Sequence, residues 1–227
     1  MSIPDLPAPL VGCLFCHAEG TITEFAPRQW FGFGSGFPRL VCNRCKAVAL
    51  FEPQDDGWRI AYQRFSKRRQ YFYAAQVLGQ AGWLAADQAI DISTKVFIQR
   101  QRLQQAQQGD LSWLKPLDVS IPNAPAAGTV YLTFAHVNLH QGGNADDQPL
   151  DTGSLFITYT TLHLLGRDRD WSYPLSQIET VDYSGAGWKI HLTTKETKRY
   201  FFCEPSQDET DPQLTTAIIK AFINPAQ

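Results

Sequence analysis

Four cysteines near the start of the chain have the spacing of metal ligands. Cys13 and Cys16 form one pair, Cys42 and Cys45 form another, and the fifth cysteine of the sequence is Cys203. Two thiolates separated by two residues can bind one metal ion, and two such pairs complete a tetrahedral zinc site. Because four thiolates fill the coordination shell, the expected zinc is structural and leaves no position for water or substrate.

Disulfides and reduced, buried thiols are the two other interpretations of these cysteines. The first ten residues hold three prolines and an aspartate instead of a charged and then apolar leader, so an oxidising compartment is not indicated. Zinc is therefore the favoured interpretation. His17 follows Cys16 directly and could replace a ligand, but four cysteines already fill the shell, and we interpret it as a bystander.

The segment from about residue 10 to residue 52 resembles a zinc ribbon. The resemblance rests on two metal-binding turns, Cys13-Leu-Phe-Cys16 and Cys42-Asn-Arg-Cys45. Strands at 21–25 and 39–41, joined by a glycine-rich turn, would form the hairpin that brings the two turns together. A zinc ribbon implies a metal and a fold but says little about function.

Length and charge indicate further modules after a ribbon domain at 1–60. The chain has 227 residues and a net charge of −2, and no apolar run approaches the length that spans a bilayer, so we expect a soluble, cytoplasmic protein of several domains. Residues 1–127 hold 13 Lys and Arg against 10 Asp and Glu, whereas residues 128–227 hold 7 against 12. This asymmetry supports a boundary in a proline-bearing linker at 115–127.

A helical hairpin is predicted for residues 61–114. From Lys67 to Gln108 the chain is rich in Ala, Gln, Leu and Arg and lacks proline, with breaks at Gly79 and Gly82. We expect one helix at about 67–79 and a second at about 83–107. Such a hairpin would pack on its neighbours or offer a face for homo-oligomerisation.

A short basic and aromatic run precedes these helices. It holds four cations interleaved with aromatic residues: Arg64, Lys67, Arg68 and Arg69. Cations neutralise phosphates and aromatic rings stack on unpaired bases, so these side chains are candidate contacts for nucleic acid or for another partner. The competing interpretation is a solvated face beside a core face, because so short a run is a weak footprint.

Residues 128–227 change to strand periodicity and end with one helix. Segments of strand length alternate or run apolar at 129–139, 154–158, 162–165, 178–183, 188–193 and 199–203. The segment from Pro212 to Phe222 has apolar residues at helical spacing. This order predicts a small antiparallel barrel capped by a C-terminal helix, and an α+β, multidomain fold for the whole chain.

This C-terminal region is similar to bacterial PH-like and GRAM-like domains. The similarity rests on three runs, Gly153–Gly166, Trp171–Val181 and Gly187–Leu192. The resemblance implies binding of phosphoinositides or peptides, or a role in holding assemblies together. The loop at 141–151 carries Asp146, Asp147 and Asp151 without Lys or Arg, so repulsion of anionic headgroups argues against membrane binding.

The sequence offers little for catalysis. No glycine-rich phosphate loop follows a strand, no Ser, His and Asp set has a motif around it, and Cys203 lies in an apolar strand typical of an inert thiol. His136 and His140 lie four apart on a predicted strand, but we interpret them as structural or surface residues. We therefore predict a non-enzymatic adaptor or scaffold that binds proteins, with nucleic-acid binding as the alternative and membrane-surface recruitment as the third possibility.

Overall fold

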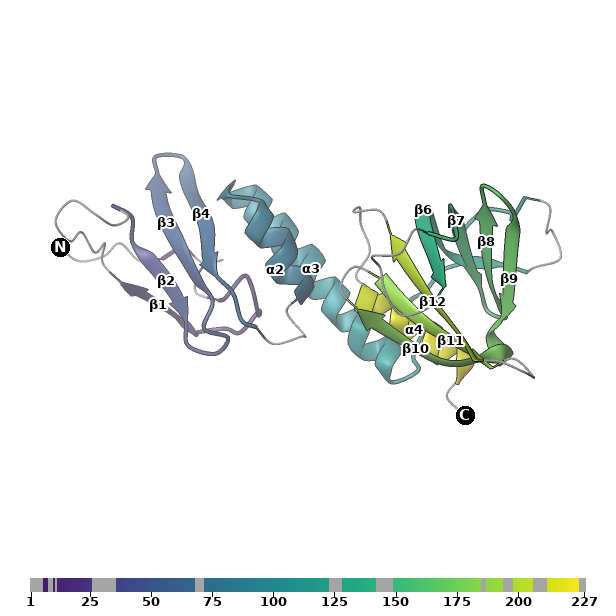
Figure 1. Ribbon diagram of the computed structural model, residues 1–227. Coiled ribbons are helices and arrows are strands. Elements are labelled where there is room, and N and C mark those ends of the chain that lie inside the picture. Colours follow the sequence, from purple (N-terminus) through teal and green to yellow (C-terminus); the bar gives the residue numbers. More distant parts are fainter. Residues whose placement is uncertain are drawn as a thin grey trace. The chain divides into compact units, whose positions relative to one another are not determined.

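The chain divides into two compact units, Met1–Gln101 and Arg102–Gln227 (Figure 1). Both combine helices with antiparallel sheets, which confirms the α+β class. None of the helices in the described ranges is long and apolar enough to cross a membrane. The computed structural model describes residues 6–7, 10, 12–25, 36–67, 72–122, 128–141, 149–184, 187–193, 198–205 and 212–224.

A five-stranded antiparallel sheet is the centre of the first unit. Its strands follow chain order: β1 (Ile22–Phe25), β2 (Arg39–Cys42), β3 (Val48–Gln54), β4 (Gly57–Arg64) and β5 (Trp83–Ala85). Side chains of β3 alternate between half-buried and buried over its first five residues, which is the period of a strand with one covered face. The β1–β2 hairpin confirms the two ribbon strands predicted from the sequence, and β3, β4 and β5 extend the sheet beyond it.

Two helices share the hydrophobic core of this sheet. Leu78 of α2 (Phe72–Gln80) and Val96 of α3 (Ala86–Gln107) belong to the same buried cluster as Phe51 and the four N-terminal cysteines. The end of α3 is set by Gly109, whose positive φ of 80° favours glycine. The boundary between the two units falls within α3, after Gln101.

The predicted helical hairpin at 61–114 differs from the structure in the segments before its helices. Strand β4 continues to Arg64, residues 68–71 before α2 lie outside the described residues, and Trp83–Ala85 forms β5 instead of the first turn of the second helix. Pairing with Arg59–Ala61 of β4 keeps β5 extended, and the Trp83 ring packs edge-on against Phe37 with 5.0 Å between ring centroids. These tertiary contacts outweigh the helix propensity of the local sequence.

The second unit is built on a seven-stranded antiparallel sheet. Its strands are β6 (Val130–Gln141), β7 (Asp151–Thr158), β8 (Thr161–Gly166), β9 (Asp170–Pro174), β10 (Ile178–Ser184), β11 (Gly187–Thr193) and β12 (Lys198–Pro205). Their spatial order is β10-β11-β12-β6-β7-β8-β9, so the first strand of the unit lies beside the last. Strand β9 is additional to the predicted segments.

This sheet is not closed into the predicted barrel. In the described part of the chain, β9 and β10 are its two edges, paired to β8 and β11 respectively. Pro174 ends β9 without an N–H for further pairing, and the 3-10 helix η3 (Leu175–Gln177) leads directly into β10. Helix α4 (Pro212–Ile223), which confirms the predicted C-terminal helix, packs against β10, β11 and η3 (Figure 1). An apolar helix face therefore covers the core here in place of strand pairing.

The core of the second unit includes residues from the end of α3. Leu103 and Ala106 belong to the same buried cluster as Trp188 of β11 and Ile219 of α4. The Trp188 indole Nε1–H donates to the Pro212 carbonyl at 3.2 Å, which joins β11 to the first residue of α4. Apolar burial and this hydrogen bond together hold α4 on the sheet.

The predicted linker at 115–127 makes at least one defined contact with the second unit. The Leu117 N–H donates to the Val130 carbonyl at 2.8 Å, and Ile121 is only 3% exposed. Residues 123–127 of this segment lie outside the described residues. The part before them is therefore tied to the start of β6 rather than free in solvent.

Candidate metal centre

The first cysteine pair lies in a tight turn before β1. The Cys13 N–H donates to the Ala18 carbonyl at 3.0 Å, and the His17 N–H donates to the Cys13 carbonyl at 2.7 Å. His17 has a positive φ of 56°, which reverses the chain after Cys16. The turn thereby directs both cysteine side chains to the same side.

The second pair repeats this turn at the end of β2. The Cys42 N–H donates to the Ala47 carbonyl at 3.0 Å, the Lys46 N–H donates to the Cys42 carbonyl at 2.9 Å, and Lys46 has a positive φ of 63°. The β1–β2 register sets Ile22 opposite Cys42, which brings the second turn beside the segment that follows the first. The hairpin therefore joins the two cysteine turns, as the sequence predicts.

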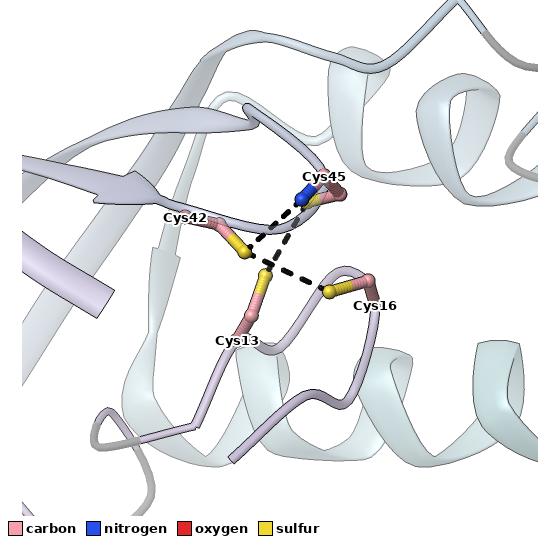
Figure 2. A group of neighbouring side chains, drawn as sticks. All are labelled: Cys13, Cys16, Cys42 and Cys45. Carbon is pink, nitrogen blue, oxygen red and sulfur yellow. Dashed lines mark hydrogen bonds between the residues drawn. The ribbon is translucent and has the colours of Figure 1, made fainter. Parts of the chain in front are cut away.

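The four sulfurs converge on one point (Figure 2). The Sγ atoms of Cys13 and Cys45 lie 3.7 Å apart, as do those of Cys16 and Cys42, and all four lie within 4.8 Å of one another. Sulfurs about 2.3 Å from a central ion define a tetrahedron with edges of about 3.8 Å. A disulfide would need about 2.05 Å, so the spacing fits metal ligands and not disulfides. The four cysteines can bind a metal ion, and the donor set is consistent with zinc.

Burial closes this centre to solvent. The four cysteines are between 1% and 6% exposed. The hydrogen bond between the Cys13 and Cys45 sulfurs raises the pKa of Cys13 and lowers the pKa of Cys45 to about 5. Burial raises the pKa of Cys16 to about 11. A bound cation would displace the thiol protons, because the thiolate is the metal ligand.

Nearby polar groups orient the sulfur of Cys42. The Cys45 N–H donates to the Cys42 Sγ at 3.4 Å, and the Thr21 hydroxyl lies 3.3 Å from the same sulfur and 2.8 Å from the Ala18 carbonyl. The Cys45 N–H fixes the direction of the Cys42 sulfur and disperses the charge of a thiolate there, whereas the Thr21 hydroxyl donates its one proton to the Ala18 carbonyl. Thr21 thus links the two turns through one hydroxyl group.

His17 is not part of the ligand group in the structure. Its ring packs against Phe97 of α3 with 4.8 Å between centroids, and its Nε2 lies 3.3 Å from the Ser93 hydroxyl. Burial, followed by the positive charge of Arg100, lowers the pKa of His17. The cluster of potential ligands among the described residues consists of the four cysteines alone, as the bystander interpretation predicts.

The predicted basic and aromatic cluster is described only in part. Arg64 ends β4 and is exposed, Lys67 is exposed, and Arg68 and Arg69 lie outside the described residues. Phe65, which lies between Arg64 and Lys67, packs against Phe15 with 5.5 Å between ring centroids, and the Phe15 ring is completely buried. The Phe65 ring therefore packs on the core and does not form a surface for base stacking.

Asp151 is a buried charge whose role the sequence did not indicate. It is 4% exposed at the start of β7, and its carboxylate accepts five hydrogen bonds. Burial opposes its charge, but the bonds from the Trp171 indole and from backbone N–H groups prevail and lower the pKa of Asp151. Asp151 therefore organises the β8–β9 turn and does not present its charge as part of a repulsive loop. Asp146 and Asp147, the other acidic residues of the predicted loop, lie outside the described residues.

Comparison with known proteins gives little further guidance. No protein-family model and no curated protein matches the sequence. One matching solved structure is the crystal structure of the N-terminally truncated linker-DH/PH domains of p115-RhoGEF, at 9% identity and a TM-score of 0.30. The match covers 71% of this chain and 50% of that chain, so it spans half of the solved structure. At this TM-score the likeness supports no functional assignment.

Proposed function

We propose that this protein is a non-enzymatic adaptor that binds other proteins through an N-terminal zinc ribbon and a C-terminal PH-like domain. The observation that carries the proposal is the closed four-cysteine centre, in which every ligand is at most 6% exposed. A four-thiolate zinc ion has no open position for water or substrate, so its contribution is to folding. The surfaces of the two units are then left to bind partners.

The PH-like and GRAM-like assignment is supported by the sequence runs together with the topology of the second unit. A seven-stranded antiparallel sheet, with its first strand beside its last and a C-terminal helix over β10 and β11, agrees with the strand order of such a domain. His136 is exposed and His140 is 3% exposed, because a bulge after Phe134 shifts the register of β6. These two histidines therefore do not share one face. This argues against a second metal site formed by both of them and supports a non-enzymatic role.

Metal analysis tests the zinc assignment. The purified full-length protein should carry about one zinc ion per chain, measured by mass spectrometry of the metal. Cys45→Ser should lower the zinc content, whereas Cys203→Ser, which changes the cysteine outside the ribbon, should not. A folded, soluble protein that contains neither zinc nor iron would contradict the proposal.

Partner capture tests the adaptor role. Full-length protein should enrich specific proteins from its native extract, and purified candidates should bind with a measurable Kd. Two exposed aromatic residues provide matched variants, Phe25→Asp in the first unit and Tyr159→Asp in the second, because they are 43% and 50% exposed. Loss of binding in one variant would assign the surface. No saturable binding to any enriched protein would refute the adaptor role.

Nucleic-acid binding is the second candidate, favoured by the exposed Arg64 and Lys67 in a unit of positive net charge. Binding to labelled single or double strands should weaken with salt, and Arg64→Ala and Lys67→Ala should each reduce the salt slope by about one. Salt-independent or absent binding would exclude it.

Cytoplasmic location and the lack of membrane recruitment are part of the proposal, and pelleting with anionic vesicles at low salt would contradict the latter.

A further inference from the structure

Helix α3 contacts the first cysteine turn through a buried serine. The Ser93 hydroxyl donates to the Leu14 carbonyl at 2.8 Å, and Ser93 is only 3% exposed. Leu14 lies between Cys13 and Cys16, so the acceptor belongs to the metal-binding turn itself. A buried hydroxyl and carbonyl that are separated lose a hydrogen bond unless water replaces it.

Two further contacts extend along the same face of α3. The Arg100 Nη1 donates to the Cys16 carbonyl at 3.3 Å, and the Phe97 ring packs against His17. Ser93, Phe97 and Arg100 are spaced by four and three residues, which places them on one side of a helix. The helix therefore contacts three residues of the segment from Leu14 to His17.

A metal ion bound by the cysteines would further restrain the positions of these acceptors. Cys13 and Cys16 hold the turn in shape when both sulfurs bind one ion, and the Leu14 and Cys16 carbonyls move with that turn. Four thiolates around Zn²⁺ also leave a net charge of −2, which favours a guanidinium bound to the backbone of a ligand residue. Binding of the metal and seating of the helix are thus linked equilibria, and each must strengthen the other.

We propose that residues 86–101 of α3 and the metal centre form a latch, in which the metal holds the helix on the first unit and Ser93 and Arg100 slow loss of the metal. Ser93 and Arg100 are positioning residues, because they act on the turn and not on the ion. This inference rests on the zinc assignment made above.

The end of α3 provides an internal reference for the test. Leu103 and Ala106 are buried in the core of the second unit, whereas Ala89 and Val96 are buried in the core of the first. Removal of the metal should therefore raise amide hydrogen exchange in residues 86–101 and leave residues 102–107 protected. Equal exchange of residues 86–101 with and without a zinc chelator would overturn the latch.

Metal release from full-length, zinc-loaded variants tests the other direction of the coupling. Ser93→Ala and Arg100→Gln should each release zinc to a coloured chelator about fivefold faster, the change expected for one hydrogen bond. Thr94→Ala is the matched control, because the Thr94 hydroxyl bonds the Ile90 carbonyl of the same helix at 2.9 Å. Lys95→Ala is the charge control, because Lys95 pairs with the exposed Asp91 at 2.8 Å.

The outcomes separate this inference from the proposed function. Wild-type release rates in both Ser93→Ala and Arg100→Gln would overturn the latch while leaving the zinc ribbon intact. Faster release in Thr94→Ala as well would overturn it too, because a general weakening of the helix would then explain the result. A protein that binds no metal would overturn the zinc assignment and the latch together, and metal analysis of the wild type identifies that case.

Discussion

Asp151→Asn should destabilise the second unit by about 3 kcal/mol, because the buried Trp171 indole N–H and the partly buried Arg169 N–H would lose their acceptor. Oδ1 of Asp151 accepts the N–H groups of Thr152, Arg167 and Asp168 at 2.8, 3.0 and 3.2 Å. Oδ2 accepts the Arg169 N–H at 3.2 Å and the Trp171 indole Nε1–H at 3.1 Å. An asparagine can keep its oxygen on the side of three donors, but its NH₂ group then faces the other two.

The magnitude follows from the cost of those unpaired donors. A buried donor without a partner costs about 1–3 kcal/mol, and the Arg169 N–H costs less because it belongs to an exposed residue, so the two together cost about 2–4 kcal/mol. For a domain of this size, 3 kcal/mol lowers Tm by about 9–12 °C. Urea unfolding followed by far-UV circular dichroism, together with differential scanning calorimetry, measures both quantities on the full-length protein.

Asp168→Asn is the matched control for the Asp151 prediction. The Asp168 side chain is 66% exposed, and its ion pair with Arg167 is 3.5 Å long, so its loss should cost less than about 0.5 kcal/mol. A second comparison is Trp171→Phe, which removes one of the two facing donors and should make Asp151→Asn less harmful in the double variant. Wild-type stability in Asp151→Asn would refute the role given to the carboxylate.

Acidification should reproduce part of this loss in the wild-type protein. The folded-state pKa of Asp151 lies below its unfolded value of about 3.9. The carboxylate therefore contributes its full stabilisation above the unfolded pKa and loses it as pH falls through the folded pKa. The second unit of Asp151→Asn should show a shallower decline of stability with acid than the wild type, and parallel curves would count against the assignment.

Three further predictions concern the two turns and the sheet. Chelation of the metal, or Cys16→Ser, should lower the unfolding temperature of the first unit and leave that of the second unchanged in calorimetry, and equal shifts in both would contradict this division. Lys46→Gly should raise the free energy of unfolding, measured with urea, by about 0.5–1 kcal/mol, because Lys46 has a positive φ of 63° that glycine adopts without strain. An unchanged free energy of unfolding would refute backbone strain at Lys46. Gly153→Ala should lower the free energy of unfolding by about 3 kcal/mol in the same measurement, because the new Cβ would lie 2.0 Å from the Leu165 carbonyl oxygen. An unchanged value would contradict this and show that β7 and β8 shift apart easily.

The four-cysteine centre was predictable because its signal is local. Two residues between cysteines set the reach of each thiolate pair, and the hairpin needed to join the pairs is visible as two short strands around glycines. The structure brings all four predicted ligands together within 4.8 Å. The C-terminal helix was predictable for a similar reason, since its apolar period is continuous from Pro212.

The departures from prediction occur where long-range contacts decide local structure. Trp83–Ala85 is a strand because β4 offers it a free edge, and no residue within that segment signals the pairing. The open sheet has the same kind of cause, because α4 covers β10 and β11 from elsewhere in the chain. Strand β9 was not predicted, because Asp170–Pro174 is short and Trp171 is its one buried residue.

The four-cysteine centre was visible in the sequence and the buried Asp151 was not, because the two are built from different kinds of groups. The cysteine centre collects side chains, and side chains leave a spacing pattern that can be read. Asp151 collects mainly backbone N–H groups from the turn at Arg167, Asp168 and Arg169, and every residue except proline carries such a group. A carboxylate that satisfies a turn in this way looks, in the sequence, like one more exposed acid in a loop. Asp151 therefore does not contribute to the expected repulsion of anionic headgroups. The charge that a partner would meet on this face is set by the side chains that reach solvent.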